Sequence, residues 1–95
     1  MEQLEFAPAA GGRRYVARFE GNEVAFAEVD PIGDDAILIK HTEVDVGHEG
    51  KGYGGALVRF LFEEAKRQNR KVIPICPFAA AWVRRHPEYQ AEVRR

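Results

Sequence analysis

The sequence has one cysteine, one methionine and no long run of apolar residues. Cys76 alone cannot form an internal disulfide, and three scattered histidines do not complete the ligand spacing of a zinc site. Nowhere do the roughly 18 consecutive apolar residues of a membrane-spanning helix occur, and the acidic N-terminus lacks a hydrophobic leader. We therefore expect a cytoplasmic protein from a reducing compartment, without a bound metal.

The sequence also lacks an excess of charge of either sign, since its formal net charge is −1. No general positive field favours nucleic acid or an anionic membrane as a partner, so an anionic ligand would have to be bound locally. Ninety-five residues with 45% hydrophobic content fit one small globular domain, residues 1–95. The sequence does not reveal the oligomeric state, and a monomer is the simpler expectation.

The hydrophobic pattern predicts an α/β fold, because strand-like alternation gives way to helical spacing along the chain. Four strands and two amphipathic helices are predicted, the strands over 14–19, 24–29, 36–46 and 71–76 and the helices over 52–68 and 78–86. The first two strands form a hairpin, and the last strand follows a right-handed crossover, parallel to its neighbour.

Several boundaries are less sharply defined by the sequence. Residues 1–13 fit a short edge strand or a loosely ordered tail equally well, and residues 88–95 fit a short helix or a frayed end. A turn is predicted from Asp30-Pro31 to Asp35. Pro74 has no N–H for a ladder, so the strand that contains it should be unpaired along part of one edge, at the sheet boundary or where two strands part.

A glycine-rich loop, residues 45–57, joins the third strand to the long helix. Glycines at positions 50, 52, 54 and 55 leave an anion free to approach the backbone N–H groups at the helix start, where the helix dipole also favours negative charge. The loop therefore predicts a cradle for a diphosphate, with Lys51 as a candidate counter-charge. The simpler alternative is a flexible turn between a strand and a helix.

Two known phosphate motifs fit the loop poorly. A P-loop would need Lys and Ser or Thr after its second glycine, but Gly52 is followed by Tyr53 and Gly54. Gly50, Gly52 and Gly55 match the dinucleotide fingerprint G-x-G-x-x-G literally. The preceding strand belongs to an antiparallel meander, however, and the next strand lacks the acidic ribose ligand.

The loop resembles the acyl-coenzyme A-binding motif R/Q-x-x-G-x-G/A of the Gcn5-related N-acetyltransferases (GNAT), with Gly52 and Gly54 at the two small positions. The sequences H-T-E-V at 41–44 and P-x-C-P-F at 74–78 resemble more closely a miniature, stand-alone subfamily of about this length. The resemblance covers about residues 14–89. It implies a truncated GNAT-like fold, a mixed sheet of an antiparallel meander plus a parallel crossover strand, with two helices.

The resemblance also implies acetyl-CoA as co-substrate and an unknown amine as acceptor. In that family, the strand before the loop bonds the pantetheine arm, the loop amides hold the diphosphate, and two parallel strands part so that the thioester reaches the amine. The coenzyme A contacts implied here are Val44, Val46, Glu49, Gly50, Lys51, Gly52, Tyr53, Gly54, Gly55, Cys76 and Phe78.

Three side chains are candidates for the chemistry. His41 and Glu43 lie two apart on a strand and should share the face of Ile37 and Ile39, unless a bulge intervenes. His41 is a candidate general base or substrate contact, or a satisfied core residue. Glu43 is a candidate of the same kind, or a solvated residue at the strand edge. Cys76 follows the parallel strand, where it could accept the acetyl group, protonate the departing thiol, or simply be a buried thiol.

Two features favour a non-catalytic alternative on the same fold. Glu49 stands where the family motif has Arg or Gln, which predicts modest affinity for coenzyme A. The helices that usually form the walls of the acceptor site are missing as well. A coenzyme A-binding or protein-interaction module without efficient chemistry is therefore the second hypothesis.

Overall fold

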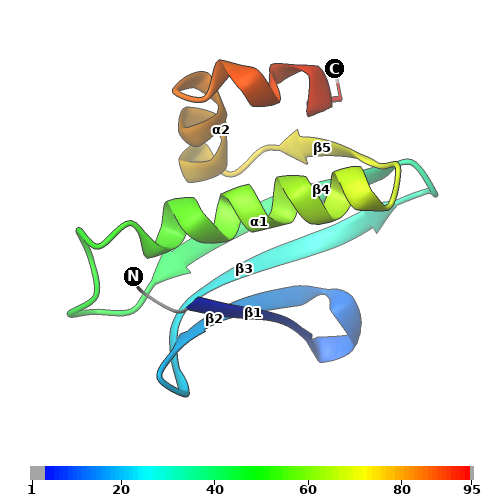
Figure 1. Ribbon diagram of the computed structural model, residues 1–95. Helices are drawn as coiled ribbons and strands as arrows, with labels where there is room; N and C mark the ends of the chain where they lie inside the picture. Colours follow the sequence, from blue (N-terminus) through cyan, green and yellow to red (C-terminus); the bar gives the residue numbers. More distant parts are fainter. Residues whose placement is uncertain (1–3, 95) are drawn as a thin grey trace.

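The computed structural model describes residues 4–94 and has a five-stranded sheet with helices packed against it (Figure 1). The elements are β1 (Leu4–Ala9), η1 (Ala10–Gly12), β2 (Arg14–Phe19), β3 (Asn22–Ile32), β4 (Ala36–Val44), α1 (Tyr53–Arg67), β5 (Lys71–Pro74), α2 (Pro77–Arg84) and η2 (Pro87–Glu92). The strands follow one another in the order β1-β2-β3-β4-β5, antiparallel up to β4 and parallel between β4 and β5. The predicted mixed α/β fold is confirmed.

The core lies between one face of the sheet and α1. Leu57, Leu61 and Phe62 point from α1 into the core and are almost completely buried. Small residues of the sheet, Ala25 and Ala27 among them, face the helix and let it approach closely. Burial of each large apolar side chain stabilises the fold by about 1.5–3 kcal/mol, so α1 and the central strands form a firm base for the segments at their ends.

Both ends of the described chain form regular structure, whereas the sequence was equally compatible with loosely ordered ends. Residues 4–9 form the edge strand β1, one of the two alternatives, and η2 follows α2 near the end of the chain. Val93 then forms an isolated parallel bridge with Val72, and the Arg94 N–H donates to the Val72 carbonyl at 2.9 Å. The parts of both predictions that concern residues 1–3 and 95 lie outside the described residues.

The predicted turn at Asp30-Pro31 is wrong in its first half. β3 continues through Pro31, which lies opposite Ile37 of β4, and the chain turns only at residues 33–35. The pairing of β3 with β2 already ends at Glu28, so the missing Pro31 N–H leaves no gap in a ladder on that side. β4 also ends at Val44, two residues before its predicted end.

A β-bulge at Lys40 changes the direction of the side chains in β4. Val29 pairs with Ile39 and Glu28 pairs with His41, which leaves Lys40 as the extra residue. After the bulge, Thr42 continues the face of Ile39 and the helices. His41 and Glu43 therefore point to the opposite face, here called the outer face, and the prediction that they continue the face of Ile37 and Ile39 is wrong.

The two parallel strands stay together over a short distance only. β4 and β5 pair from Ala36 with Lys71 to Ile39 with Pro74, and the Cys76 N–H makes one further bond, 3.1 Å, to the Ile39 carbonyl. Beyond that point, residues 40–44 of β4 have no β5 partner in the described chain. Pro74 thus lies where the strands part, which agrees with its predicted position.

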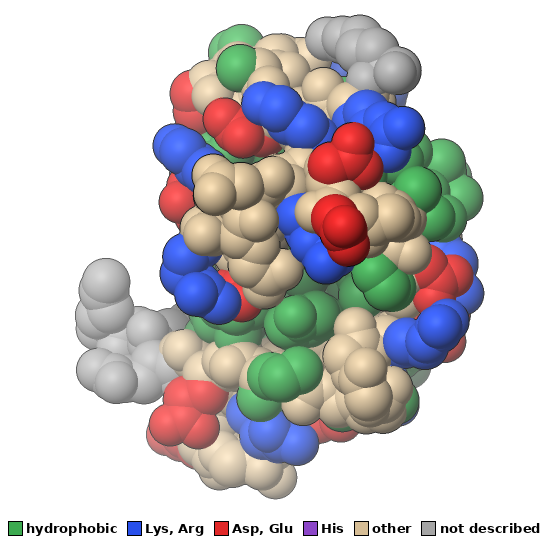
Figure 2. All heavy atoms as spheres, turned by 90° about the vertical axis from the view of Figure 1, so that its right-hand side faces the viewer, with side chains coloured by type: hydrophobic (Ala, Val, Ile, Leu, Met, Phe, Trp, Pro, Cys, Tyr) green, Lys and Arg blue, Asp and Glu red, His purple; other side chains and the backbone are tan. Residues whose placement is uncertain are grey.

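The end of the molecule opposite the glycine-rich loop carries mixed charges, with Lys and Arg side chains next to Asp and Glu side chains (Figure 2). Ion pairs of the fold include Arg13–Asp30, Lys40–Asp30, Arg67–Glu64, Lys71–Glu92 and Arg94–Asp35. Each exposed pair contributes at most about 1 kcal/mol. Within residues 4–94, neither helix has the length and apolar character needed to cross a bilayer.

Candidate active site

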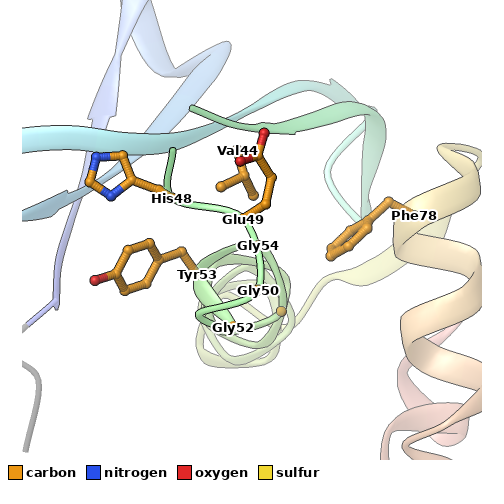
Figure 3. A pocket seen from close by; sticks show the side chains of 9 residues that line it. Val44, His48, Glu49, Gly50, Gly52, Tyr53, Gly54 and Phe78 are labelled. Carbon is orange, nitrogen blue, oxygen red and sulfur yellow. The ribbon is translucent and has the colours of Figure 1, made fainter. Parts of the chain in front are cut away.

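A cavity of about 210 Å³ lies where β4 ends, the glycine-rich loop begins and α1 starts, with α2 opposite (Figure 3). Its lining residues are Val44, His48, Glu49, Gly50, Gly52, Tyr53, Gly54, Gly55 and Phe78. Seven of the predicted coenzyme A contacts besides Val44 are in this set: Glu49, Gly50, Gly52, Tyr53, Gly54, Gly55 and Phe78. The fold therefore brings most of the loop and the start of α2 together around one hollow.

The glycines of the loop serve two different purposes. Gly50 and Gly52 both have φ of +81°, a conformation that favours glycine, and a Cβ at either would meet nothing within 4 Å. A Cβ on Gly54 would instead lie 2.8 Å from Phe78 Cζ, and one on Gly55 would lie 3.2 Å from Trp82 Nε1. Access for an anion was the expected reason for all four glycines, but close packing of α1 against α2 accounts for Gly54 and Gly55.

Several backbone N–H groups remain available at the cavity. The first bond of α1 runs from the Ala56 N–H to the Gly52 carbonyl at 3.0 Å, so the N–H groups of Gly54 and Gly55 precede the helical ladder. Among the described residues, the N–H groups of Gly50 and Gly52 also have no acceptor. A helix start with free N–H groups can bind phosphate.

Glu49 gives the loop its shape and places a negative charge at the cavity. Its Oε1 accepts a hydrogen bond of 2.9 Å from the Gly47 N–H, and its side chain lines the same cavity as Val44 (Figure 3). A carboxylate in the lining of the cavity opposes the binding of a phosphate there by repulsion between like charges.

His48 was not predicted as a site residue. It lines the cavity, and its ring lies 5.9 Å from that of Tyr53, which is itself buried against Phe19. The Nδ1 atom of His48 is buried without a hydrogen-bond partner among the described residues. The only signal for it in the sequence was its position inside the glycine-rich loop.

Other predicted contacts lie away from the cavity lining. Val46 is 93% exposed, and Lys51 is an exposed loop residue. Cys76 is only 3% exposed, and its Sγ donates to Thr42 Oγ1 at 3.7 Å. Cys76 also precedes α2 as its N-cap residue, and its carbonyl accepts the Ala80 N–H at 2.9 Å. The thiol is therefore a buried group at the point where β4 and β5 part.

His41 and Glu43 form a pair on the outer face of β4. His41 Nε2 lies 3.0 Å from Glu43 Oε1, and the two side chains are 50% and 58% exposed. That they share a face is confirmed. The His41 ring lies 5.9 Å from that of Phe26, over which the Arg14 guanidinium packs at 4.2 Å. Within residues 4–94, no cluster of acidic, histidine or cysteine side chains could hold a metal ion.

The free edge of β4 presents backbone groups to the gap. The Asp45 N–H donates to the Val24 carbonyl at 2.9 Å, so Asp45 faces β3. Because successive residues of a strand direct their backbone groups to opposite sides, Val44 and Thr42 direct theirs to the edge that β5 leaves open. An extended ligand could pair with this edge as a neighbouring strand would.

The site combines a free strand edge with a glycine-rich helix start. A comparison of the sequence with protein families agrees with this arrangement. A family model described as GCN5-related N-acetyl-transferase matches residues 14–93. The chain belongs to this family.

This GNAT chain also resembles solved structures. It matches a GCN5-like protein from Staphylococcus aureus with 26% identity and a TM-score of 0.74, over 99% of this chain and 91% of that one. Rv2747 from Mycobacterium tuberculosis, solved in complex with CoA, shares 24% identity over 80% of this chain and 48% of its own, with a TM-score of 0.66. No curated protein is detectably similar.

A GNAT family acetyltransferase from Elizabethkingia anophelis, solved with acetyl-CoA bound, shares 18% identity and a TM-score of 0.62. The match covers 80% of this chain and 51% of that protein. This chain therefore spans about half the length of the two ligand-bound structures, and their identities support a common fold.

Proposed function

We propose that this protein binds acetyl-CoA and transfers the acetyl group to an amine, as one acetyltransferase domain of the miniature GNAT subfamily with the H-T-E-V and P-x-C-P-F motifs. The observation that carries the proposal is the free edge of residues 40–44, which leads directly into the helix start with its unpaired N–H groups. Relatives of the same fold were solved with CoA and with acetyl-CoA.

In this proposal the diphosphate binds to the N–H groups of Gly50, Gly52, Gly54 and Gly55. A cavity of about 210 Å³ is smaller than the ~300–1,000 Å³ of a site that encloses a whole drug-sized ligand. The pantetheine arm would therefore leave the cavity along the edge of Val44 and Thr42. The nucleotide would extend over the surface, where Val46 and Lys51 are exposed.

His41 is the proposed general base, in reach of an acceptor that approaches the outer face. If its Nε2–H donates to Glu43, Nδ1 keeps a lone pair for the proton of the ammonium group. The oxyanion of the tetrahedral intermediate would accept a hydrogen bond from a strand N–H near Val44. The burial of Cys76 favours direct transfer to the amine over an acetyl-cysteine intermediate.

Titration calorimetry with acetyl-CoA tests the binding step, and binding at millimolar ligand or below is expected. Release of coenzyme A thiol over a panel of amines then tests the transfer step. His41→Ala should bind acetyl-CoA as the wild type does but release thiol more slowly. Absence of any binding by the wild-type protein would refute the proposal.

The second candidate is a coenzyme A-binding or interaction module without efficient catalysis. The Glu49 carboxylate in the lining of the cavity favours it, as does the half-exposed position of His41. The amine panel separates the two functions, because a binding module would give the same background thiol release in the wild type and in His41→Ala.

A further inference from the structure

The bulge at Lys40 gives two consecutive residues of β4 opposite surroundings. His41 points to the outer face, where its ring contacts Phe26 and Glu43. Thr42 points to the helix face, where its hydroxyl meets the thiol of Cys76. Without the extra residue this assignment would be reversed, since a shift of one residue moves every side chain of a strand to the other face.

The Cys76 thiol meets the Thr42 hydroxyl close to the point where β4 and β5 part. The thiol donates and Thr42 Oγ1 accepts, over 3.7 Å. A threonine hydroxyl accepts through its lone pairs and has one proton to donate, so this contact leaves the Thr42 proton for another acceptor. Cys76 is itself held in place, because its N–H bonds to the Ile39 carbonyl and its carbonyl starts α2.

Thr42 lies between the cavity and the point where β4 and β5 join. The strand advances about 3.3 Å per residue, so an arm that enters beside Val44 passes Thr42 before the gap closes at Ile39 and Cys76. Thr42 also directs its backbone groups to this open edge. An arm that runs along this edge to the point where the strands join would therefore pass the Thr42 hydroxyl.

We propose that Thr42 is a further catalytic residue, whose hydroxyl, oriented by Cys76, donates a hydrogen bond to the coenzyme A sulfur as it departs. The inference rests on the proposed function. The amine nitrogen attacks the thioester carbon, the carbon–sulfur bond breaks, and its electron pair stays on sulfur. Of the two protons that leave the ammonium nitrogen, one passes through His41 to solvent and one ends on the coenzyme A thiol.

The test measures the pKa of the thiol of bound coenzyme A, which does not require an acceptor amine. The ultraviolet absorbance of the thiolate is titrated in the complex with coenzyme A, and the complex with desulfo-coenzyme A provides the reference that removes the protein's own cysteine and tyrosines. The wild type is compared with Thr42→Val, which keeps the shape but lacks the hydroxyl, and with Thr42→Ser, which keeps the hydroxyl.

We expect the pKa of the bound thiol to rise by about one unit in Thr42→Val, because a hydrogen bond to a charged acceptor is lost, and to stay near the wild-type value in Thr42→Ser. Thiol release with an amine should fall about tenfold in Thr42→Val, with the dissociation constant of acetyl-CoA changed by less than about threefold. Equal thiol pKa values in all three proteins would overturn the role of Thr42 and leave the acetyltransferase proposal standing. Absence of coenzyme A binding by the wild type would overturn both.

Discussion

Gly54 shows how a single residue can determine the distance between two elements. Its α-carbon faces Phe78 of α2 and Val44 of β4 so closely that a Cβ would approach them to 2.8 Å and 3.1 Å. Neither neighbour can give way without moving the wall of the cavity. Glycine at this position therefore lets α1 approach α2 and β4 closely, and its N–H remains available to a ligand.

We predict that Gly54→Ala lowers the free energy of unfolding by about 1–3 kcal/mol, because the added methyl group overpacks this contact. Chemical denaturation measures the change. Phe78→Leu removes the ring atoms nearest to the new methyl group, so the double variant should recover part of the loss. Strict additivity of the two single changes would show that the contact is not the cause.

Glu49 is the residue at which this chain departs most clearly from a phosphate site. We predict that Glu49→Gln binds acetyl-CoA about fivefold more tightly, a gain of about 1 kcal/mol, since the amide oxygen can still accept the Gly47 N–H while the negative charge is removed. Titration calorimetry at low ionic strength measures the change.

Glu43→Gln provides the matched control, because it removes the same charge from the outer face and should leave the affinity for acetyl-CoA unchanged. The gain in Glu49→Gln should also shrink as salt is added, since exposed charges are screened. Weaker binding in Glu49→Gln would show that the carboxylate does not repel the phosphates of the ligand. It would indicate instead that the carboxylate holds the loop in the shape that binds the ligand.

At the scale of elements, η2 is fixed to α1 by one tyrosine. The Tyr89 hydroxyl donates to Glu63 Oε2 at 2.5 Å and accepts from Arg59 Nη1 at 3.2 Å, and the Arg59 guanidinium also packs over the rings of Tyr89 and Trp82. The hydrogen bond to the Glu63 carboxylate raises the pKa of Tyr89 above its ordinary value near 10.0, since the carboxylate holds the phenol proton.

We predict that Tyr89→Phe lowers the free energy of unfolding by about 1 kcal/mol at neutral pH. The contribution of a group with a raised folded pKa is complete below its unfolded pKa and is lost as the pH rises through the folded value. The difference between wild type and Tyr89→Phe should therefore be constant up to about pH 10 and shrink above it. A difference that stayed constant into strong alkali would contradict this.

Sequence periodicity predicted most of the helices and strands, but it did not predict to which face of the sheet the side chains of β4 point. Alternation predicts a strand and the residues that share a face, as His41 and Glu43 do. A bulge adds one residue without changing the local composition, so Lys40 gave no signal of its own. The bulge depends on the register with β3, which is a tertiary property, and it decides whether His41 or Thr42 faces Cys76.

The site was predictable to a similar extent. Glycines and a helix start predicted a cradle at the place where the structure has a cavity, because the chemistry of free N–H groups is local in sequence. The second purpose of Gly54 and Gly55 was not visible, since it depends on where α2 packs. The buried state of Cys76 and the place of His48 also depend on neighbours that are distant in the chain.

At the scale of the whole molecule, a ligand in the proposed site would touch three elements that the fold otherwise joins only in part: β4, the start of α1 and the start of α2. Binding to the folded state alone stabilises a protein in proportion to the logarithm of ligand concentration. Coenzyme A should therefore stabilise the entire fold against heat.

We predict that coenzyme A at about 100 times its dissociation constant adds about 2.7 kcal/mol and raises Tm by about 10 °C, as measured by thermal unfolding. Desulfo-coenzyme A should give a similar rise, because in the proposed binding mode the diphosphate makes the main contacts. At one fixed concentration, Glu49→Gln should show the larger rise. An unchanged Tm at saturating ligand would contradict preferential binding to the folded state.

The bridge between Val93 and Val72 affects whether the sheets of two copies of this protein can pair edge to edge. Val93 and Arg94 lie against Val72 of β5, so part of that edge of the sheet is already paired, and β1 forms the opposite edge. Pro8 in β1 supplies no donor there. Edge-to-edge pairing of sheets from two molecules is therefore disfavoured at both edges, by the paired Val93 segment at β5 and by the missing N–H of Pro8 at β1.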